Sequence, residues 1–472
     1  MPHSWKKPRT DVGIVDCGHP LGVRPRGNLL LLQQNEVVLR QKLLGPFLSL
    51  LPDEILMTIL GDLENPNDLL AVSHTCRALY AYSFFDEFWK RLVYNGRQPS
   101  KWYGSWRRSC LRLDGSKEAR IDVKDQVFSD VLFRPFQCAQ IDYESIIEVA
   151  QKGPTVIPSF LERDVTLTKF EKELHKSPFK IKLATPSAGW SLDDLIHSYA
   201  DTVFRQEYMD WKLSMYNDYM NSNTDESPLY LFDCHSEAMK ELQYTVPLDD
   251  VFGHRRDYFE LFKARRPDHR WLIIGPKRSG STFHKDPNGT SAWNSIISGK
   301  KYWIMFPPDR LPAGISTDGE ESEVTAPTSL AEWFLSGFYE QAKREPGFHH
   351  AICEQNECMY VPSGWWHLVV NLTESVALTG NFVGRPKLGV VLDFLKNKKD
   401  QISGFQNQFY VYQEFVAKLE NADPTALREA LEEVRSIEGK RAGRHRTTLW
   451  TTPENDEAAT FSFGFESEEH TA

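Results

Sequence analysis

The stretch that decides the fold is residues 281–309, STFHKDPNGTSAWNSIISGKKYWIMFPPD, in which short apolar and aromatic runs alternate with turn residues. If its first residues form a strand, the two-residue period places Thr282, His284 and Asp286 on one face. The residues between them then point to the other face. A histidine and an aspartate therefore project the same way, which predicts that this face lines a polar site.

The sequence around this stretch is typical of a series of short strands. RWLIIGP, KKYWIMFPP, CMYVPSGWWHLVVNL and SVALTGNF are rich in β-branched and aromatic residues and are separated by Pro, Gly and Asn, as in antiparallel barrels and jelly rolls. The same alternation places His367 and Asn371 on one face of their strand, and Thr379 and Asn381 on one face of the next. Polar inward faces predict a lined cavity, and the helical segments on either side make the fold class α+β.

Two histidines and one carboxylate form the ligand set of non-haem Fe(II) oxygenases, because they leave three coordination positions free for a chelating cosubstrate and dioxygen. His284, Asp286 and His367 offer that set. A His-x-Asp pair with one distant histidine is a weak signal on its own. The alternative is that the three are surface residues or hydrogen-bonded core residues, and from the residues alone both interpretations stay open.

Composition limits the classes of protein that fit. The chain has 472 residues, 41% hydrophobic and 25% charged, as in globular proteins of two or three domains. Its formal net charge of -10 argues against direct nucleic-acid binding and favours basic partners. Seven scattered cysteines do not suggest a secreted disulfide framework. Because we find neither a signal peptide nor a run of about 18 apolar residues, we expect no membrane association and a cytoplasmic or nuclear location.

Changes of pattern along the chain predict five segments. Residues 1–45 are expected to form a flexible leader, and residues 46–95 a small helical domain whose first helix, LPDEILMTILGDL, has acidic residues at its start and apolar residues at helical spacing. Residues 120–385 mix helices with the strands described above. Residues 386–450 return to helical periodicity, and residues 451–472 are expected to form a disordered acidic tail.

Two long motifs, GPKRSGSTFHKDPNGTSAWNSIISGKKYWIMFP and YVPSGWWHLVVNLTESVALTGNF, resemble the JmjC domain of Fe(II)- and 2-oxoglutarate-dependent oxygenases. Within that family they are closely similar to the phosphatidylserine-receptor type, whose members are lysyl hydroxylases and arginine demethylases. YNDYMNSNTDESPLYLFD matches the strand that precedes the domain there. The resemblance implies a double-stranded β-helix of the jelly-roll or cupin type, with flanking helices.

Carried over by position, the resemblance makes His284, Asp286 and His367 the iron ligands and the catalytic centre. The implied site for 2-oxoglutarate contains Lys301, Thr379, Asn294, Tyr230, Ser281 and Asn381. Lys301 and Thr379 would hold the distal carboxylate of 2-oxoglutarate, which would give a buried lysine the anionic partner it needs. The alternative for Lys301 is an exposed strand lysine. Ser281 stands where the close relative has Thr, and keeps the hydroxyl.

The sequence LPDEILMTILGDLENPNDLLAVSHTCRALYAYSFFDEFWKRLV resembles an F-box. In that family the opening helix and a later one bind the Skp adaptor of cullin-RING ubiquitin ligases, which implies this partner here. The expected contacts are Leu51, Pro52, Ile55, Leu56, Leu60 and Leu69. The alternative is a three-helix cap that packs on the oxygenase, since amphipathic helices mostly bury their apolar faces within their own chain.

Together the two resemblances imply an Fe(II)- and 2-oxoglutarate-dependent protein oxygenase coupled to an F-box, acting on a basic, Lys- or Arg-bearing protein as a lysyl hydroxylase or a histone or protein demethylase. Of these we favour lysyl hydroxylation. The main alternative is a substrate receptor of an SCF-type ubiquitin ligase that uses the JmjC barrel only for recognition, and a metal-free structural cupin is a third. A basic cluster at residues 439–446, GKRAGRHR, is typical of nuclear import signals and also of helix C-termini.

Overall fold

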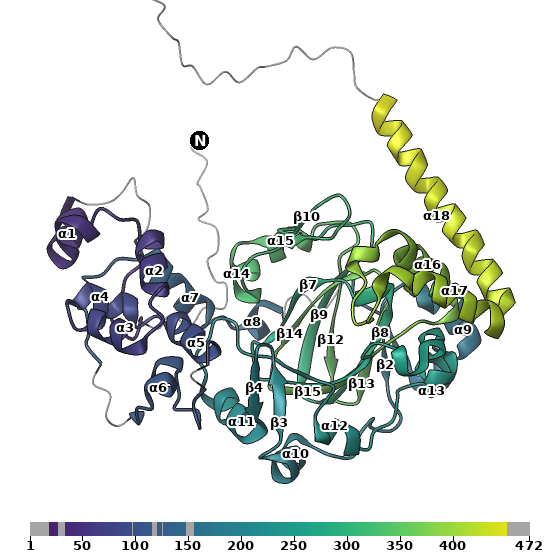
Figure 1. The fold of residues 1–472 in the computed structure, drawn as a ribbon, viewed down its shortest axis with the longest axis horizontal. Helices are drawn as coiled ribbons and strands as arrows, with labels where there is room; N and C mark the ends of the chain where they lie inside the picture. Colours follow the sequence, from purple (N-terminus) through teal and green to yellow (C-terminus); the bar gives the residue numbers. More distant parts are fainter. Residues whose placement is uncertain are drawn as a thin grey trace, which may run out of the picture.

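The computed structural model describes residues 18–26, 34–96, 98–115, 120–124, 126–147 and 155–450. Figure 1 shows a central β-structure with helices on both sides. The described strands are β1 (Ser159–Leu161), β2 (Phe179–Lys182), β3 (Val203–Gln206), β4 (Met209–Lys212), β5 (Leu231–Asp233), β6 (Arg270–Gly275), β7 (Gly280–His284), β8 (Ser291–Ser298), β9 (Lys300–Phe306), β10 (Ser316–Thr317), β11 (Val324–Thr325), β12 (His349–Glu354), β13 (Glu357–Val361), β14 (Trp366–Asn371) and β15 (Ser375–Phe382). The predicted α+β fold class is confirmed.

The strands form two main sheets. The larger has the order β1-β2-β13-β8-β15-β6-β5-β3-β4, and the smaller has the order β12-β9-β14-β7. From β6 to β9, and again from β12 to β15, successive strands alternate between the two sheets, and within these two runs the ladders are antiparallel. This alternation is the double-stranded β-helix that the sequence predicts.

The side chains of β15 show how the larger sheet separates two cores. Val376 and Leu378 are buried in a large apolar cluster that includes helices outside the sheet. Ala377 belongs instead to the cluster between the sheets, with Trp303 of β9 and Val369 of β14. The predicted two-residue alternation of β15 is therefore confirmed, and its other inward residues are free to line a cavity.

One strand ends earlier than predicted. β7 ends at His284, and Asp286 lies in the connection that leads into a short 3-10 turn, Pro287–Gly289. The prediction that a strand carries both residues is wrong, because Pro287 and the turn after it stop the ladder. Asp286 nevertheless keeps an extended backbone, with φ -64 and ψ 146. It therefore still reaches the inner side of the sheet.

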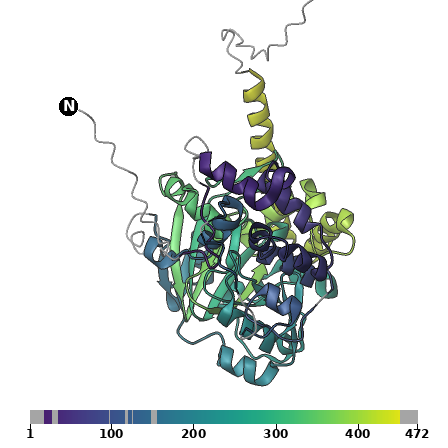
Figure 2. The ribbon, with the colours of Figure 1, turned by 90° about the vertical axis from the view of Figure 1, so that its left-hand side faces the viewer.

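The N-terminal helical domain consists of short helices, α1 (Gln34–Leu48), α2 (Asp53–Gly61), α3 (Pro66–Ser73), α4 (Arg77–Ser83), α5 (Asp86–Tyr94) and α6 (Trp106–Leu111). Local sequence sets their starts: the Asn65 side chain accepts a hydrogen bond from the Asn67 amide, and Pro66 occupies the first turn of α3, where its missing N–H costs nothing. Figure 2 shows these helices lying in front of the β-structure.

Burial corrects the expected adaptor contacts. Leu56, Leu60 and Leu69 are at most 3% exposed and lie in the apolar core, so these three residues hold the helical domain together and do not present a binding surface. Helical spacing identified an apolar face but could not tell which apolar side chains the rest of the chain covers. Ile55, in contrast, is 48% exposed.

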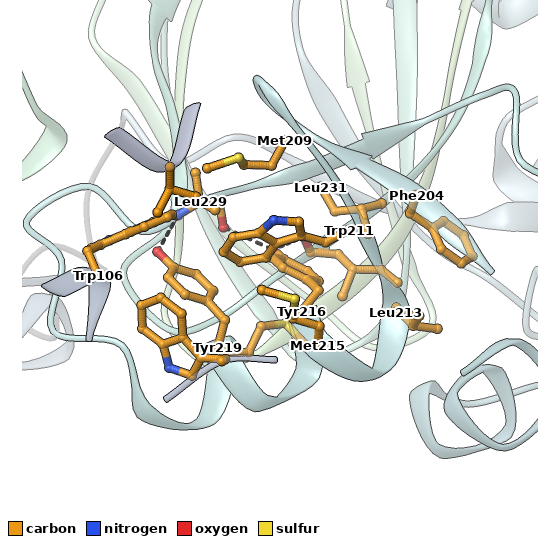
Figure 3. Close-up of a cluster of buried hydrophobic side chains, with 14 of the residues drawn as sticks. Trp106, Phe204, Met209, Trp211, Leu213, Met215, Tyr216, Tyr219, Leu229 and Leu231 are labelled. Atoms are coloured by element: carbon orange, nitrogen blue, oxygen red, sulfur yellow. Dashed lines mark hydrogen bonds between the residues drawn. The ribbon is translucent and has the colours of Figure 1, made fainter. Parts of the chain in front are cut away.

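The helical domain shares its core with the β-structure. The ring of Trp106 lies 5.5 Å from that of Trp211 and 5.9 Å from that of Tyr219, between ring centroids, and Figure 3 shows these rings in one cluster. The Trp106 indole also donates to both carboxylate oxygens of Asp225, at 2.9 Å each. Aromatic packing and a buried hydrogen bond therefore join the two parts of the chain.

Part of the predicted flexible leader is packed. Leu21 and Val23 are each 2% exposed, and Arg24 forms a parallel bridge with Phe128. The leader prediction is wrong for residues 18–26, because these contacts join segments far apart in the sequence and leave no local pattern. Residues 1–17 and 27–33 lie outside the described residues.

Three helices follow the last strand, α16 (Leu388–Asn397), α17 (Val411–Ala422) and α18 (Pro424–Trp450). They lie on the side of the β-structure opposite the N-terminal helices, and α18 extends away from the body (Figure 1). Val391, Phe415 and Val434 contribute to their own apolar core. The predicted acidic tail, residues 451–472, lies outside the described residues.

Among the described residues, no single helix is both long and apolar enough to cross a membrane. One pair, Val37–Leu48 and Asp53–Gly61, bent by 48°, has the required length and composition when taken together.

Candidate active site

Pairing between β7 and β14 brings the two predicted histidine ligands together. His284 and His367 are directly opposite each other in this ladder, and their ring centroids are 4.1 Å apart. One ligand atom from each of His284, Asp286 and His367 can be chosen so that all three lie within 4.8 Å of one another. Two imidazoles and a carboxylate thus converge as the ligand set for a non-haem Fe(II) would require.

Both histidines are oriented by backbone carbonyl groups. His284 Nδ1 lies 2.7 Å from the Thr282 carbonyl oxygen, and His367 Nδ1 lies 3.1 Å from the Trp365 carbonyl oxygen. A carbonyl can only accept, so each Nδ1 carries the proton and leaves Nε2 free as a ligand. Burial, together with the neighbouring His284, lowers the pKa of His367 well below its usual value, which keeps that imidazole neutral and ready to bind a metal.

The third residue of this set, Asp286, has a carboxylate oxygen that the protein leaves without a partner. Asp286 Oδ2 is a buried oxygen with no hydrogen-bond partner, and burial raises the pKa of the Asp286 carboxyl. A buried carboxylate oxygen without a donor is costly, and a cation is the partner that would compensate it. The donor set therefore fits a divalent metal.

All nine residues predicted for the site line one cavity of about 230 Å³. They are His284, Asp286, His367, Lys301, Thr379, Asn294, Tyr230, Ser281 and Asn381. The cavity lies between the two sheets, because its walls include residues of β6, β8 and β15 on one side and of β9 and β14 on the other. The structure thus brings the whole predicted set together, while the role of each residue stays a prediction.

Lys301 is the most unusual residue of the cavity wall. It is fully buried on β9, where its ammonium group donates to the Tyr230 hydroxyl and lies 5.1 Å from the centre of that ring. Burial lowers the pKa of Lys301 to about 7, because no carboxylate in the described part of the chain forms an ion pair with it. An anionic ligand would supply the missing partner and restore the charge.

Neutral polar groups surround this lysine. Asn294 Oδ1 is buried without a hydrogen-bond partner. The Thr379 hydroxyl donates to the Trp293 carbonyl at 2.7 Å, and the Asn381 amide donates to the Thr290 hydroxyl at 2.8 Å. Because the hydroxyl of Thr379 and the carboxamide of Asn381 keep further lone pairs or protons, both remain able to bind a ligand.

Two aromatic residues of the wall were missed by the sequence reasoning. Phe232 and Trp271 line the same cavity, and Phe232 is 40% exposed, with its ring 4.8 Å from that of Tyr230. The two-residue spacing could have identified them: Phe232 in β5 is two positions after Tyr230, and Trp271 is two positions before Ile273 in β6.

A double-stranded β-helix that holds two histidines, a carboxylate and an unpaired lysine in one cavity defines a cupin-type metal-dependent oxygenase. Comparison with known families agrees. A family model described as a cupin-like domain matches residues 156–387, and one described as F-box-like matches residues 48–95.

Individual relatives fall in the same group. The chain is 34% identical to arginine-specific demethylase JMJ22 of Arabidopsis thaliana, over 94% of this chain and 88% of the relative. It is also 34% identical to the bifunctional arginine demethylase and lysyl-hydroxylase psr-1 of Caenorhabditis elegans, over 43% of this chain and 53% of the relative. A third, the 2-oxoglutarate and iron-dependent oxygenase JMJD4 of Danio rerio, is 26% identical over 43% of this chain and 46% of the relative.

The chain belongs to the JmjC family of cupin-like oxygenases, and it carries an F-box-like domain at its N-terminal side. The predicted family, fold and enzyme class are therefore confirmed, as are Fe(II) and 2-oxoglutarate as its cofactor and cosubstrate.

Proposed function

We propose that the chain is a protein oxygenase that oxidises Lys or Arg side chains, with His284, Asp286 and His367 as its iron ligands. The observation that carries the proposal is the set of buried polar groups that the protein leaves without partners in one cavity. Asp286 Oδ2 and Asn294 Oδ1 lack hydrogen bonds, and Lys301 lacks an anion. A metal-free structural cupin would have no reason to keep them, because each unsatisfied group costs stability.

When bound, Fe(II) and 2-oxoglutarate supply the oxidation, in which one atom of dioxygen enters succinate, the other enters a substrate C–H bond, and CO₂ is released. The residues of the chain orient and shield this chemistry. His284 and His367 present Nε2 because carbonyl groups hold Nδ1. Lys301 would receive the distal carboxylate of 2-oxoglutarate, with Thr379, Asn294 and Tyr230 beside it.

Two reactions on protein side chains are compatible with this chemistry. Hydroxylation of a lysine carbon gives a stable alcohol, whereas hydroxylation of an N-methyl group gives an unstable carbinolamine that loses formaldehyde and leaves the amine with one methyl group fewer. The relative that aligns over most of this chain is named an arginine-specific demethylase, so we place arginine demethylation first. The second relative is named for both activities, so lysyl hydroxylation remains the second candidate.

The experiment is a reaction of the full chain with Fe(II), 2-oxoglutarate and pairs of peptides carrying Lys or N-methylarginine, followed by mass spectrometry and formaldehyde detection. Demethylation predicts loss of one methyl group with formaldehyde, and hydroxylation predicts a gain of one oxygen without it. Succinate production without oxidation of any peptide would contradict a protein substrate.

The F-box-like domain supports a second part of the proposal, binding of the Skp adaptor of a cullin-RING ubiquitin ligase. Several apolar side chains on α1 and α2 and in the connection between them are exposed: Phe47 by 81%, Leu50 by 80%, and Ile55 and Ile59 by 48% each. Because the core of this domain is already complete, this surface is available for a partner. The test is co-purification of the purified adaptor with the wild-type chain and with Ile55→Asp combined with Ile59→Asp.

A substrate receptor that uses the barrel only for recognition is the competing function. It is supported by the same exposed helices, but recognition requires neither the histidine pair nor a buried lysine. If the adaptor binds while no 2-oxoglutarate is consumed under any condition, the receptor function is the better account. A nuclear location remains a proposal that rests on the basic cluster at residues 439–446.

A further inference from the structure

A second cavity, of about 350 Å³, adjoins the metal-binding residues. It shares Ser281 and His284 of β7 with the cosubstrate cavity. Three other places in the chain also contribute to its wall: Glu207 in the turn between β3 and β4, Glu226 in the loop before β5, and Thr328 just before α14 (Leu330–Leu335). We call this cavity, lined by these five residues and their neighbours, the acidic vestibule.

The two carboxylates of the vestibule accept hydrogen bonds from neutral groups. Glu226 accepts a hydrogen bond of 2.5 Å from the Ser329 hydroxyl, and Glu207 accepts one of 3.3 Å from the Tyr230 backbone amide. In the described part of the chain, no lysine or arginine forms an ion pair with either carboxylate. Burial raises the pKa of Glu207, and the charge of nearby Lys90 offsets only part of that effect.

The surroundings reinforce the negative character. Glu87 and Asp225 also interact electrostatically with Glu207. The cation that faces Glu207 is Lys90, and Arg134 interacts with Glu226. On the wall itself, Arg278 is the opposing charge, and its guanidinium is engaged with the Asp225 carbonyl at 2.7 Å. Carboxylates therefore outnumber cations around the vestibule, so a positively charged side chain is favoured there and an acidic one is repelled.

We propose that the acidic vestibule admits the substrate side chain to the metal ligands, and that Glu207 and Glu226 bind its cationic end. This inference rests on the proposed oxygenase function and names the residues that select Lys or Arg side chains. His284 belongs to both cavities, so a side chain held in the vestibule lies beside one ligand. The cosubstrate 2-oxoglutarate would bind in the other cavity, at Lys301. Substrate and cosubstrate would thus approach the same metal site from different cavities.

The test is direct binding, which does not depend on turnover. The full chain with Mn(II) and 2-oxoglutarate is titrated into a fluorescein-labelled peptide of glycine and serine that carries two lysines, and into the same peptide with both lysines acetylated. Fluorescence polarisation reports affinity. We expect the wild-type chain to prefer the charged peptide by at least about 10-fold, as for charge-assisted hydrogen bonds. Glu207→Gln combined with Glu226→Gln should bring the preference close to equality.

The matched control is Glu420→Gln combined with Glu432→Gln, which removes the same two charges from exposed positions on α17 and α18 and should keep the wild-type preference. A similar loss in this control would mean that only the net charge matters, and a preserved preference in the double variant would also overturn the inference. The single variants serve if the double variant unfolds. Wild-type production of succinate without a lysine preference contradicts the vestibule alone, whereas a preference that requires Glu207 and Glu226 without any succinate contradicts the oxygenase function alone.

Discussion

Buried polar groups behave differently in the N-terminal helical domain and in the β-helix. In the helical domain and at its junction, two buried carboxylates are paired: Asp53 lies 2.7 Å from Arg40 and accepts from the Tyr82 hydroxyl at 2.8 Å. Asp225 accepts hydrogen bonds from Trp106 and Tyr219. Between the sheets, in contrast, Asp286 Oδ2 and Asn294 Oδ1 have no partner.

The difference distinguishes buried polar groups that stabilise the fold from buried polar groups that are available to bind a ligand. A paired carboxylate contributes to stability through the hydrogen bonds it satisfies, and its removal leaves its partners unsatisfied. A buried carboxylate oxygen without a partner does not stabilise the ligand-free protein in this way, and it can destabilise it. Variants in the two regions should therefore have opposite consequences for stability and activity.

The largest effect is expected from Asp286→Ala. Changes to residues that merely support metal ligands cost about 10- to 100-fold in metal affinity or activity, so loss of a ligand should reduce Fe(II)-dependent succinate formation by more than about 100-fold. Its unfolding free energy should stay within about 1 kcal/mol of wild type, or rise. Succinate assays with chemical denaturation check both, and a variant that keeps its turnover would remove Asp286 from the ligand set.

The matched change at the junction is Asp225→Ala. It leaves the Trp106 indole and the Tyr219 hydroxyl without their acceptor, so the unfolding free energy should fall by about 2–3 kcal/mol. Asp210→Ala, at an exposed carboxylate on β4, is the control and should change it by less than about 0.5 kcal/mol. Equal losses in Asp225→Ala and Asp286→Ala would break the distinction between the two regions.

Lys301→Met should weaken 2-oxoglutarate binding by at least about 10-fold, because it removes a charge-assisted contact with a carboxylate. The unfolding free energy of the ligand-free protein should not fall, since methionine fills the space without a buried ammonium group. Lys300→Met is the control, because Lys300 is the exposed neighbour on the same strand. Isothermal titration of 2-oxoglutarate in the presence of Mn(II) measures the difference, which should be absent in Lys300→Met.

The pH dependence of the unfolding free energy tests the same lysine through a smaller expected effect. Burial lowers the pKa of Lys301 to about 7, whereas an unfolded lysine titrates near 10.4. Between these values the unfolded chain binds more protons, so this group should make the ligand-free protein more stable as pH rises from about 7 toward 10. Denaturation curves at pH 7, 8 and 9 should show this slope in wild type relative to Lys301→Met, and parallel pH profiles would contradict it.

The smallest effect on the oxygenase is expected from the exposed face of α2. Ile55→Asp combined with Ile59→Asp should abolish adaptor binding while succinate formation stays unchanged, because both side chains point away from the shared core. Leu56→Ala, one position along, should instead lower the unfolding free energy by about 2–4 kcal/mol, since Leu56 is only 1% exposed. Binding by the double variant would place the adaptor surface elsewhere.

Much of the candidate site could be predicted from sequence, because strand alternation reports which residues share a face. His367, Thr379 and Asn381 follow that period, and Lys301 lies where an inward residue of β9 was expected. The period failed at Asp286, where the strand ends and the turn brings the carboxylate to the same cavity by another path. The local sequence pattern therefore predicted which residues form the ligand set, but it did not predict the backbone conformation at Asp286.

Contacts between distant segments could not be predicted in this way. The acidic vestibule combines Glu207, Glu226 and Thr328 from three separate connections, and none of these residues stands in a periodic pattern. The junction between Trp106 and Asp225 is similar, because an indole and a carboxylate more than 100 positions apart carry no mutual signal. Such pairs become visible only when the two parts of the chain are packed together.

The central claim is that Asp286 Oδ2 is left without a hydrogen-bond partner for a metal, and Lys301 without an anionic partner for 2-oxoglutarate. It is tested most directly by the unfolding free energy of the full chain with and without Mn(II) plus 2-oxoglutarate, because ligands that bind only the folded state stabilise it by about 2.7 kcal/mol at 100 times their dissociation constant. The wild-type chain should gain stability of this order, while Asp286→Ala and Lys301→Met should gain much less. Equal stabilisation of all three proteins, or none in the wild type, would contradict the account.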